Sequence, residues 1–185
     1  MRFVKLTAFL LVVLFTSDSA AGDVEAMCAN YPAKPCQYKI TYRNSDYMDP
    51  EEWFQLGKDS CVKVVTLPQV NWVNAEAACS SFSYRYFYGH LVSIRTTQEL
   101  NGTICAMYRK NSYRQHYWIA LHKMRGETNL WTDGTENGFI NWGKNQPNLD
   151  FLPQYCVKIN SVDWGYYDDV DCFQYNGFVC QVRFE

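Results

Sequence analysis

Apolar residues at helical spacing mark the first regular element of the chain, near residue 72. Asn71 is of a type that favours helix N-caps, and the apolar residues after it share one helical face: Trp72, Ala75, Cys79 and Phe82. A second such stripe follows Thr96 and Glu99, which have the spacing of a capping box: Leu100, Ile104 and Met107. Gly102 lies inside this segment and lowers its helix propensity. The pattern predicts two helices.

After Gln115 the pattern changes to short apolar runs between turn residues, which is typical of β-strands. The turn signals are Asp133-Gly134, Asn137-Gly138 and a long loop through Pro147 and Pro153. The predicted strands cover residues 118–121, 130–131, 139–142, 156–159 and 177–182. Two helices followed by several short strands predict an α+β domain.

The N-terminus has the pattern of a secretory signal peptide. Arg2 and Lys5 precede an apolar run over residues 6–15, and small residues follow up to Ala21, where we expect cleavage, with Gly22 as the alternative. The run is too short to span a bilayer, which takes about 20 apolar residues, although a retained signal anchor is the other interpretation. We therefore expect a signal peptide at 1–21, a Cys-containing extension with three prolines at 22–52, and one domain at 53–185.

Composition narrows the class of protein further. The 17 Lys and Arg against 19 Asp and Glu give a formal charge of −2 without any basic block, which argues against nucleic acid as a partner. The 6 Trp, 14 Tyr and 11 Phe supply a core and exclude intrinsic disorder. Eight Cys without a C-x-x-C pair indicate disulfides and an oxidising, extracellular compartment.

Several motifs, taken in order, resemble the C-type lectin domain family. They are Trp72-x-x-Ala75 with Cys79, His90-Leu-Val-Ser-Ile94, Trp118-Ile-Ala-Leu121, Trp131-x-Asp-Gly134, Phe139-x-x-Trp142, Gln146-Pro-Asn148, Cys156, Tyr167-Asp-Asp169, Cys172 and Phe178-Val-Cys180. The resemblance covers residues 53–180. It implies two helices, two small antiparallel sheets and a long ligand-binding loop at about residues 133–165.

The resemblance also implies disulfide pairs. Two pairs follow the family pattern, Cys79–Cys180 and Cys156–Cys172. Four cysteines remain, which allow three pairings. Long-form members carry an upstream partner for a cysteine at the position of Cys61, so we favour Cys36–Cys61, which leaves Cys28–Cys105.

In sugar-binding members of the family, five positions hold one Ca²⁺ and the sugar. Here they are Gln146, Asn148, Gln154, Asp168 and Asp169, and the resemblance makes these the expected metal and sugar ligands. Ca²⁺ prefers about six to eight oxygen ligands, which carboxylates and amide carbonyls provide. A cis bond between Gln146 and Pro147 is expected at this turn.

The sequence departs from the family at three of these positions. The triplet Gln-Pro-Asn mixes the mannose-type and galactose-type patterns and therefore does not choose between them. Gln154 stands where the family has an acid, and Tyr167-Asp168-Asp169 replaces Trp-Asn-Asp. The five positions carry a formal −2, from Asp168 and Asp169, against the usual −3, which predicts weak Ca²⁺ binding unless Asp150 compensates.

The remaining residues with functional chemistry give weaker signals. Trp164, Tyr166 and Tyr167 can either stack on a galactose-like ring or pack within the loop. His90 is expected to be structural, and His116 and His122 match no metal-binding spacing. Asn101-Gly-Thr103 is an N-glycosylation sequon.

Two functions remain open on the sequence alone. The first is a secreted Ca²⁺-dependent lectin that binds glycans on cell surfaces or microbes. The alternative is a Ca²⁺-independent module that binds a protein ligand. The sequence has no nucleophile or phosphate-loop motif, so we do not expect an enzyme.

Overall fold

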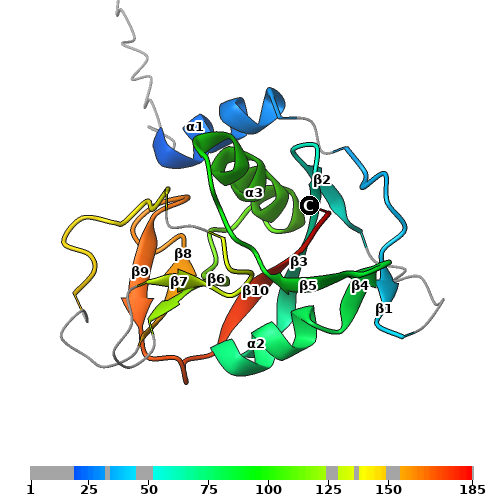
Figure 1. The fold of residues 1–185 in the computed structure, drawn as a ribbon. Coiled ribbons are helices and arrows are strands. Elements are labelled where there is room, and N and C mark those ends of the chain that lie inside the picture. The colour runs from blue at the N-terminus through cyan, green and yellow to red at the C-terminus, as the bar shows by residue number, and fades with distance from the viewer. Residues whose placement is uncertain are drawn as a thin grey trace, which may run out of the picture.

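The computed structural model describes residues 19–31, 34–44, 52–123, 129–135, 138–148 and 155–184. Residues 1–18 of the predicted signal peptide, Asp150 and Gln154 lie outside this part of the chain. The helices are α1 (Ser19–Ala29), α2 (Trp72–Cys79) and α3 (Thr97–Lys110) (Figure 1). The strands are β1 (Thr41–Tyr42), β2 (Phe54–Leu56), β3 (Ser60–Val70), β4 (Phe82–Tyr84), β5 (Phe87–Leu91), β6 (Tyr117–Lys123), β7 (Leu130–Trp131), β8 (Tyr155–Ile159), β9 (Tyr167–Val170) and β10 (Asn176–Arg183).

Both helices predicted from the sequence are confirmed as α2 and α3. Asn71 caps α2, because its side chain accepts a hydrogen bond from the Asn74 backbone N–H at 2.9 Å. Trp72, Ala75 and Cys79 are buried as the stripe predicts, whereas the helix ends at Cys79 and Phe82 belongs to β4. The prediction that Phe82 belongs to this helix is therefore wrong.

Helix α3 begins with the predicted cap and tolerates its glycine for a packing reason. Thr96 Oγ1 accepts a hydrogen bond from the Glu99 N–H at 3.1 Å. The Glu99 carboxylate turns back to the Arg95 N–H at 2.7 Å, one residue before the cap. A Cβ at Gly102 would lie 2.6 Å from Leu56 Cδ1, so a larger residue here would require the Leu56 side chain to shift, whereas glycine lets α3 approach β2 without it.

Strand β10 lies at the centre of the sheet. It pairs antiparallel with β3 and β5 and parallel with β6, which continues to β8 and β9. Strands β1, β4 and β5 form a smaller antiparallel ladder that meets the main ladder at β5. The fold class is α+β as predicted, and the structure adds two features: helix α1, which runs from the end of the predicted signal peptide into the extension, and the parallel pairing of β10 with β6.

The strand predictions succeed except in one segment. Residues 130–131 form β7, and the segments 118–121, 156–159 and 177–182 lie within β6, β8 and β10. The prediction for 139–142 is wrong, because this segment contributes only an isolated bridge between Trp142 and Tyr167. Strands β1 to β5 and β9 were not predicted.

Four disulfides join Cys28–Cys105, Cys36–Cys61, Cys79–Cys180 and Cys156–Cys172, the pairs that the sequence analysis favours. The first ties α1 to α3, and the second ties the extension to β3. Backbone hydrogen bonds add to this attachment, from the Cys36 N–H to the Trp53 carbonyl and from the Gln55 N–H to the Lys34 carbonyl. Disulfides and backbone hydrogen bonds therefore hold the described parts of the extension against the domain.

A cluster of charged side chains joins the β2–β3 turn, the start of α3 and β10. Arg95 Nη2 lies 2.7 Å from Asp59 Oδ2 and 2.8 Å from Glu99 Oε1, and Arg183 Nη1 lies 3.3 Å from the same Glu99 oxygen. Burial alone would raise the pKa of Asp59, but the hydrogen bond and charge of Arg95 outweigh it and lower that pKa. The cluster therefore joins the C-terminal end of β10 to the β2–β3 turn and to the start of α3.

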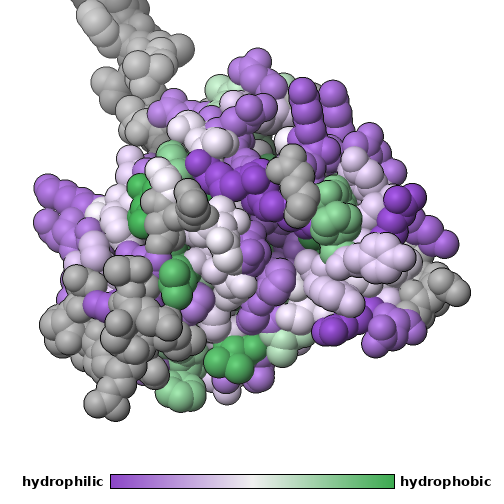
Figure 2. All heavy atoms as spheres, in the orientation of Figure 1, coloured by the Kyte–Doolittle hydropathy of each residue, from purple (hydrophilic) through white to green (hydrophobic). Residues whose placement is uncertain are grey.

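The surface is mixed rather than strongly apolar. Figure 2 shows small, separate hydrophobic patches among hydrophilic side chains on the face in view. Such scattered patches are normal for a protein in water. Within the described residues, no helix has the length and apolar character needed to cross a membrane.

The first prediction concerns the pair that Glu76 of α2 makes with His90 of β5. Glu76 Oε1 lies 2.7 Å from His90 Nδ1, and this hydrogen bond raises the pKa of His90 above its ordinary 6.5. The stabilisation is therefore fully present below about pH 6.5 and is lost as the pH rises through the raised value. We expect Glu76→Gln to lower the His90 titration midpoint measured by NMR.

The same substitution should destabilise the protein more at pH 5 than at pH 8, measured by denaturant unfolding. His116 is the internal control, because its pKa is lowered by burial and by Lys158, away from Glu76. A His90 midpoint that does not move in Glu76→Gln would contradict the assignment.

Candidate functional site

The segment that carries the expected ligands is anchored to strand β9. The Tyr167 N–H donates to the Asn141 carbonyl at 2.8 Å, and the Gly143 N–H donates to the Tyr167 carbonyl at 2.9 Å. The Trp142 ring packs edge-on against Tyr155 and Tyr167, with centroid distances of 6.4 and 6.2 Å. Backbone and aromatic contacts to β8 and β9 therefore fix where the following turn begins.

The turn around Pro147 brings together three of the five expected ligands. The bond between Gln146 and Pro147 is cis, as expected. The Asn148 N–H donates to Asp169 Oδ1 at 2.8 Å, which joins the turn to β9. Gln146 Oε1 is buried and has no hydrogen-bond partner within the described residues. We call Gln146, Asn148 and Asp169 the Pro147 site.

Asp168 occupies the opposite face of β9. Successive side chains of a strand point to opposite faces, and Asp168 pairs across the ladder with Lys158 of β8. Its Oδ2 lies 3.4 Å from Lys158 Nζ and accepts a hydrogen bond from Ser161 Oγ at 2.9 Å. The structure therefore directs the Asp168 carboxylate to a lysine rather than to Asn148.

The sequence analysis did not single out Lys158 and Ser161, although both determine what Asp168 can do. The alternation of β8 alone does not reveal the contact, because it depends on the register between β8 and β9. That register pairs Val157 with Asp169 and Lys158 with Asp168. The signal that the sequence offered for this contact was a charged residue, Lys158, inside the predicted strand 156–159.

The Pro147 site offers oxygen atoms of the kind that a hard cation such as Ca²⁺ prefers. It offers the Gln146 and Asn148 amide groups and the Asp169 carboxylate, which is 1% exposed. Gln146 Oε1 is among the buried side-chain polar atoms that have no partner within the described residues, which makes it a candidate ligand oxygen. Within the described residues, no group of three His, Cys, Asp or Glu could hold a metal. The donors fit a hard cation but bring little negative charge.

The aromatic residues near the site mostly serve packing. Tyr167 is fully buried, and this burial raises the pKa of its hydroxyl. Trp164 packs edge-on against Tyr108 at 5.7 Å. Tyr166, at 40% exposed, is the member of the three that offers a ring to solvent. Loop packing, one of the two interpretations left open by the sequence, thus accounts for Trp164 and Tyr167.

The histidines and the sequon lie elsewhere in the fold. His90 binds Glu76, and His122 is buried with Nδ1 3.0 Å from the Ala120 carbonyl. Asn101 lies half-buried on α3, where its Nδ2 donates to the Tyr31 hydroxyl at 3.3 Å. These contacts give the histidines structural roles and leave Asn101 at a helix surface.

Similarity to known proteins agrees with this geometry. The family model described as "Lectin C-type domain" matches residues 68–182. The C-type isolectin Sp-CL4 of Scorpaena plumieri is 26% identical over 130 residues, covering 70% of this chain and 85% of the relative. A C-type lectin mannose-binding isoform of Oxyuranus scutellatus is 29% identical over 141 residues, covering 73% of this chain and 84% of the relative.

Among solved structures, the C-type lectin CEL-I from Cucumaria echinata has the same fold. Its TM-score is 0.65 at 23% identity, covering 74% of this chain and 99% of that chain. The residues that match the family model run from strand β3 to strand β10. They include the Pro147 site and the Cys79–Cys180 and Cys156–Cys172 disulfides. The chain therefore belongs to the C-type lectin domain family.

Proposed function

We propose that this protein is a secreted carbohydrate-binding protein and that the Pro147 site holds the sugar. The observation that carries the proposal is the contact between Asn148 and Asp169 in the turn that also holds Gln146, whose buried Oε1 has no partner within the described residues. A desolvated oxygen without a partner is costly in the free protein, and a ligand that engages it removes this cost. The family and the lectin names of its relatives support the same role.

Calcium is the proposed cofactor of this site, and its affinity is expected to be low. When bound, Ca²⁺ supplies free coordination positions for two neighbouring sugar hydroxyls. The Gln146 and Asn148 amides and the Asp169 carboxylate are the residues that would hold the ion and hydrogen-bond the sugar. Asp169 is the one described carboxylate assigned to the ion, since Asp168 is engaged by Lys158 at 3.4 Å.

Secretion and a non-catalytic role complete the proposal. The N-terminal pattern and the four disulfides support an extracellular location. The expected partners are glycans on cell surfaces or microbes. Gln154, the fifth expected ligand, belongs to the proposal on the family resemblance alone, and the mannose-type and galactose-type ligands both stay open.

A Ca²⁺-independent protein-binding role is the second candidate, and one contact favours it. The ion pair between Lys158 and Asp168 neutralises the carboxylate at a position where the family has a metal-binding asparagine. The −2 at the five ligand positions is thus reduced in effect to the charge of Asp169. In this case the same surface would bind a protein ligand in the presence of a chelator.

The structure offers a matched pair of variants to test the calcium site. Asp169→Asn removes the carboxylate of the Pro147 site but keeps an oxygen that can accept the Asn148 hydrogen bond. Asp168→Asn removes the same charge from the opposite face of β9. We expect Asp169→Asn to reduce Ca²⁺ affinity at least tenfold by isothermal titration and to abolish sugar binding. Asp168→Asn should change both by less than threefold.

Thermal unfolding of both variants serves as the folding control for this pair. Equal losses from Asp168→Asn and Asp169→Asn would mean that the two carboxylates are equivalent, which the opposite faces of β9 do not allow. Retention of sugar binding in Asp169→Asn would leave the protein-binding role as the better account.

A third prediction uses the position where the family normally has an acid. Gln154→Glu adds one negative charge at nearly constant side-chain size. We expect it to raise Ca²⁺ affinity about tenfold, equivalent to about 1.4 kcal/mol, because a unit charge close to a cation contributes a few kcal/mol before desolvation and repulsion reduce it. Isothermal titration measures the change. Unaltered affinity would remove Gln154 from the ligand set.

A further inference from the structure

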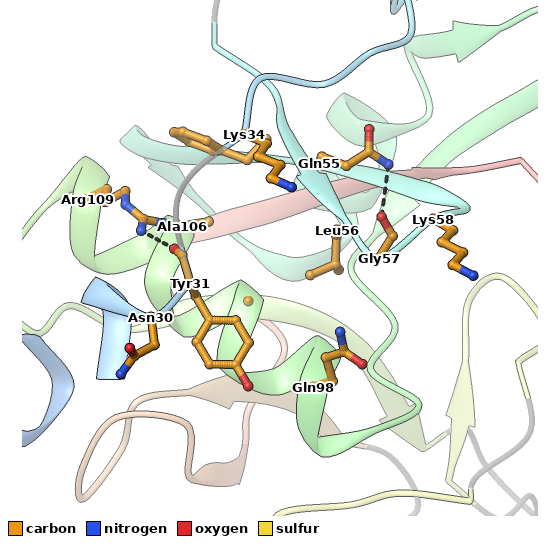
Figure 3. A pocket seen from close by; sticks show the side chains of 12 residues that line it. Asn30, Tyr31, Lys34, Gln55, Leu56, Gly57, Lys58, Gln98, Ala106 and Arg109 are labelled. Carbon is orange, nitrogen blue, oxygen red and sulfur yellow. Dashed lines mark hydrogen bonds between the residues drawn. The ribbon is translucent and has the colours of Figure 1, made fainter. Parts of the chain in front are cut away.

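A cavity lies between the extension, the β2–β3 turn and helix α3. Its volume is about 400 Å³, within the range of roughly 300–1,000 Å³ that is usual for small-ligand sites. None of its lining residues belongs to the Pro147 site. Figure 3 shows Tyr31, Lys34, Gln98 and Arg109 around its opening. We call it the extension cavity.

The lining of the extension cavity is cationic. Lys34 from the extension, Lys58 from the β2–β3 turn and Arg109 from α3 all line it, and no Asp or Glu is among its described lining residues. Within the described part of the chain, neither lysine has a carboxylate partner. The whole chain carries a formal −2, so this local concentration of positive charge runs against the net charge. A concave surface lined by one sign of charge attracts ligands of the opposite sign.

Arg109 is held in place with donors to spare. Its Nη2 donates to the Cys28 carbonyl at 2.9 Å and to the Tyr31 carbonyl, both at the end of α1. The Cys28 carbonyl also accepts a hydrogen bond from the Tyr31 N–H at 3.2 Å, so Arg109 adds to the capping of the end of α1 and holds it against α3. Within the described residues, no hydrogen bond engages its Nε or Nη1. A fixed guanidinium with free donors is suited to the planar or tetrahedral oxygens of an anion.

The remaining surface of the cavity suits a sugar ring. Phe54, Leu56 and Ala106 form an apolar floor and are themselves buried. The Tyr31 ring lies beside the opening, and its hydroxyl is bound by Asn101 at 3.3 Å (Figure 3). Gln98 adds an exposed amide at the rim. An apolar floor, an aromatic ring and a polar rim match the apolar face and the hydroxyls of a pyranose.

We propose that the extension cavity binds an acidic saccharide unit, with its sulfate or carboxylate held by Lys34, Lys58 and Arg109. The saccharide ring lies on the apolar floor beside Tyr31. This binding is independent of calcium, because the cavity itself supplies the positive charge. It is also independent of the Pro147 site, with which it shares no residue.

The test measures binding of a sulfated heparin-derived disaccharide to the full disulfide-bonded protein by isothermal titration. The variant that removes the charge is Lys34→Gln with Lys58→Gln. The matched control is Lys39→Gln with Lys110→Gln, which removes two exposed lysines outside the lining. Arg109 is left intact because it caps α1. We expect the first variant to lose at least tenfold in affinity and the control less than twofold.

Three further ligands separate the sources of the charge. Binding of an unsulfated uronic-acid disaccharide shows that a carboxylate suffices, and failure to bind shows that sulfate is required; both agree with the proposal. If sodium sulfate competes for the cavity as strongly as the disaccharide at equal molar concentration, the saccharide ring adds nothing to binding. That result overturns the proposed role of the ring. A neutral disaccharide should not bind.

Two controls keep this test distinct from the proposed function. Binding of the sulfated disaccharide should persist in excess chelator and in Asp169→Asn. Loss in both would assign the binding to the Pro147 site and overturn the proposal. Equal losses in the lining variant and the matched control, or no loss in either, would also overturn it.

Discussion

The disulfide between Cys79 and Cys180 is the constraint on which the rest of the structure depends. It fastens the end of α2 to the central strand β10 across 101 residues of sequence. Closing a loop of about 100 residues removes roughly 5 kcal/mol of chain entropy from the unfolded state. Strand β10 then carries β3 and β5 on one side and β6 on the other, and β6 leads to β8 and β9. The position of Asp169 on β9 therefore follows from that anchored strand.

The two proposed binding surfaces use different supports. The Pro147 site relies on β9, whose Tyr167 backbone holds the preceding segment and whose Asp169 holds Asn148. The extension cavity relies on the docking of α1 and the extension, which the Cys28–Cys105 and Cys36–Cys61 disulfides secure. Hydrogen bonds to β9 thus support the first surface, and disulfides support the second. A change in the extension can alter one surface without moving the other.

Local signals in the sequence predicted the local structure well. Asn71 and Thr96 fixed the starts of α2 and α3 because a cap depends on only three neighbouring residues. Contacts between segments that lie far apart in the sequence were harder to predict. The strand expected at 139–142 fails because the Tyr167 backbone and aromatic packing of Trp142 replace a ladder there. The pairing of Asp168 with Lys158 needs the β8–β9 register, and the fit of Gly102 needs the approach of Leu56. The cationic cavity joins three segments that no local pattern connects.

The measurement that tests the central claim most directly is chelator elution from immobilised sugar. The disulfide-bonded protein is loaded in calcium on mixed mannose and galactose agarose, and excess chelator is then applied. The account predicts retention in calcium and release by the chelator, since a site with few carboxylates binds the ion weakly and releases it readily. Failure to be retained in calcium, or retention that the chelator does not reverse, would contradict it.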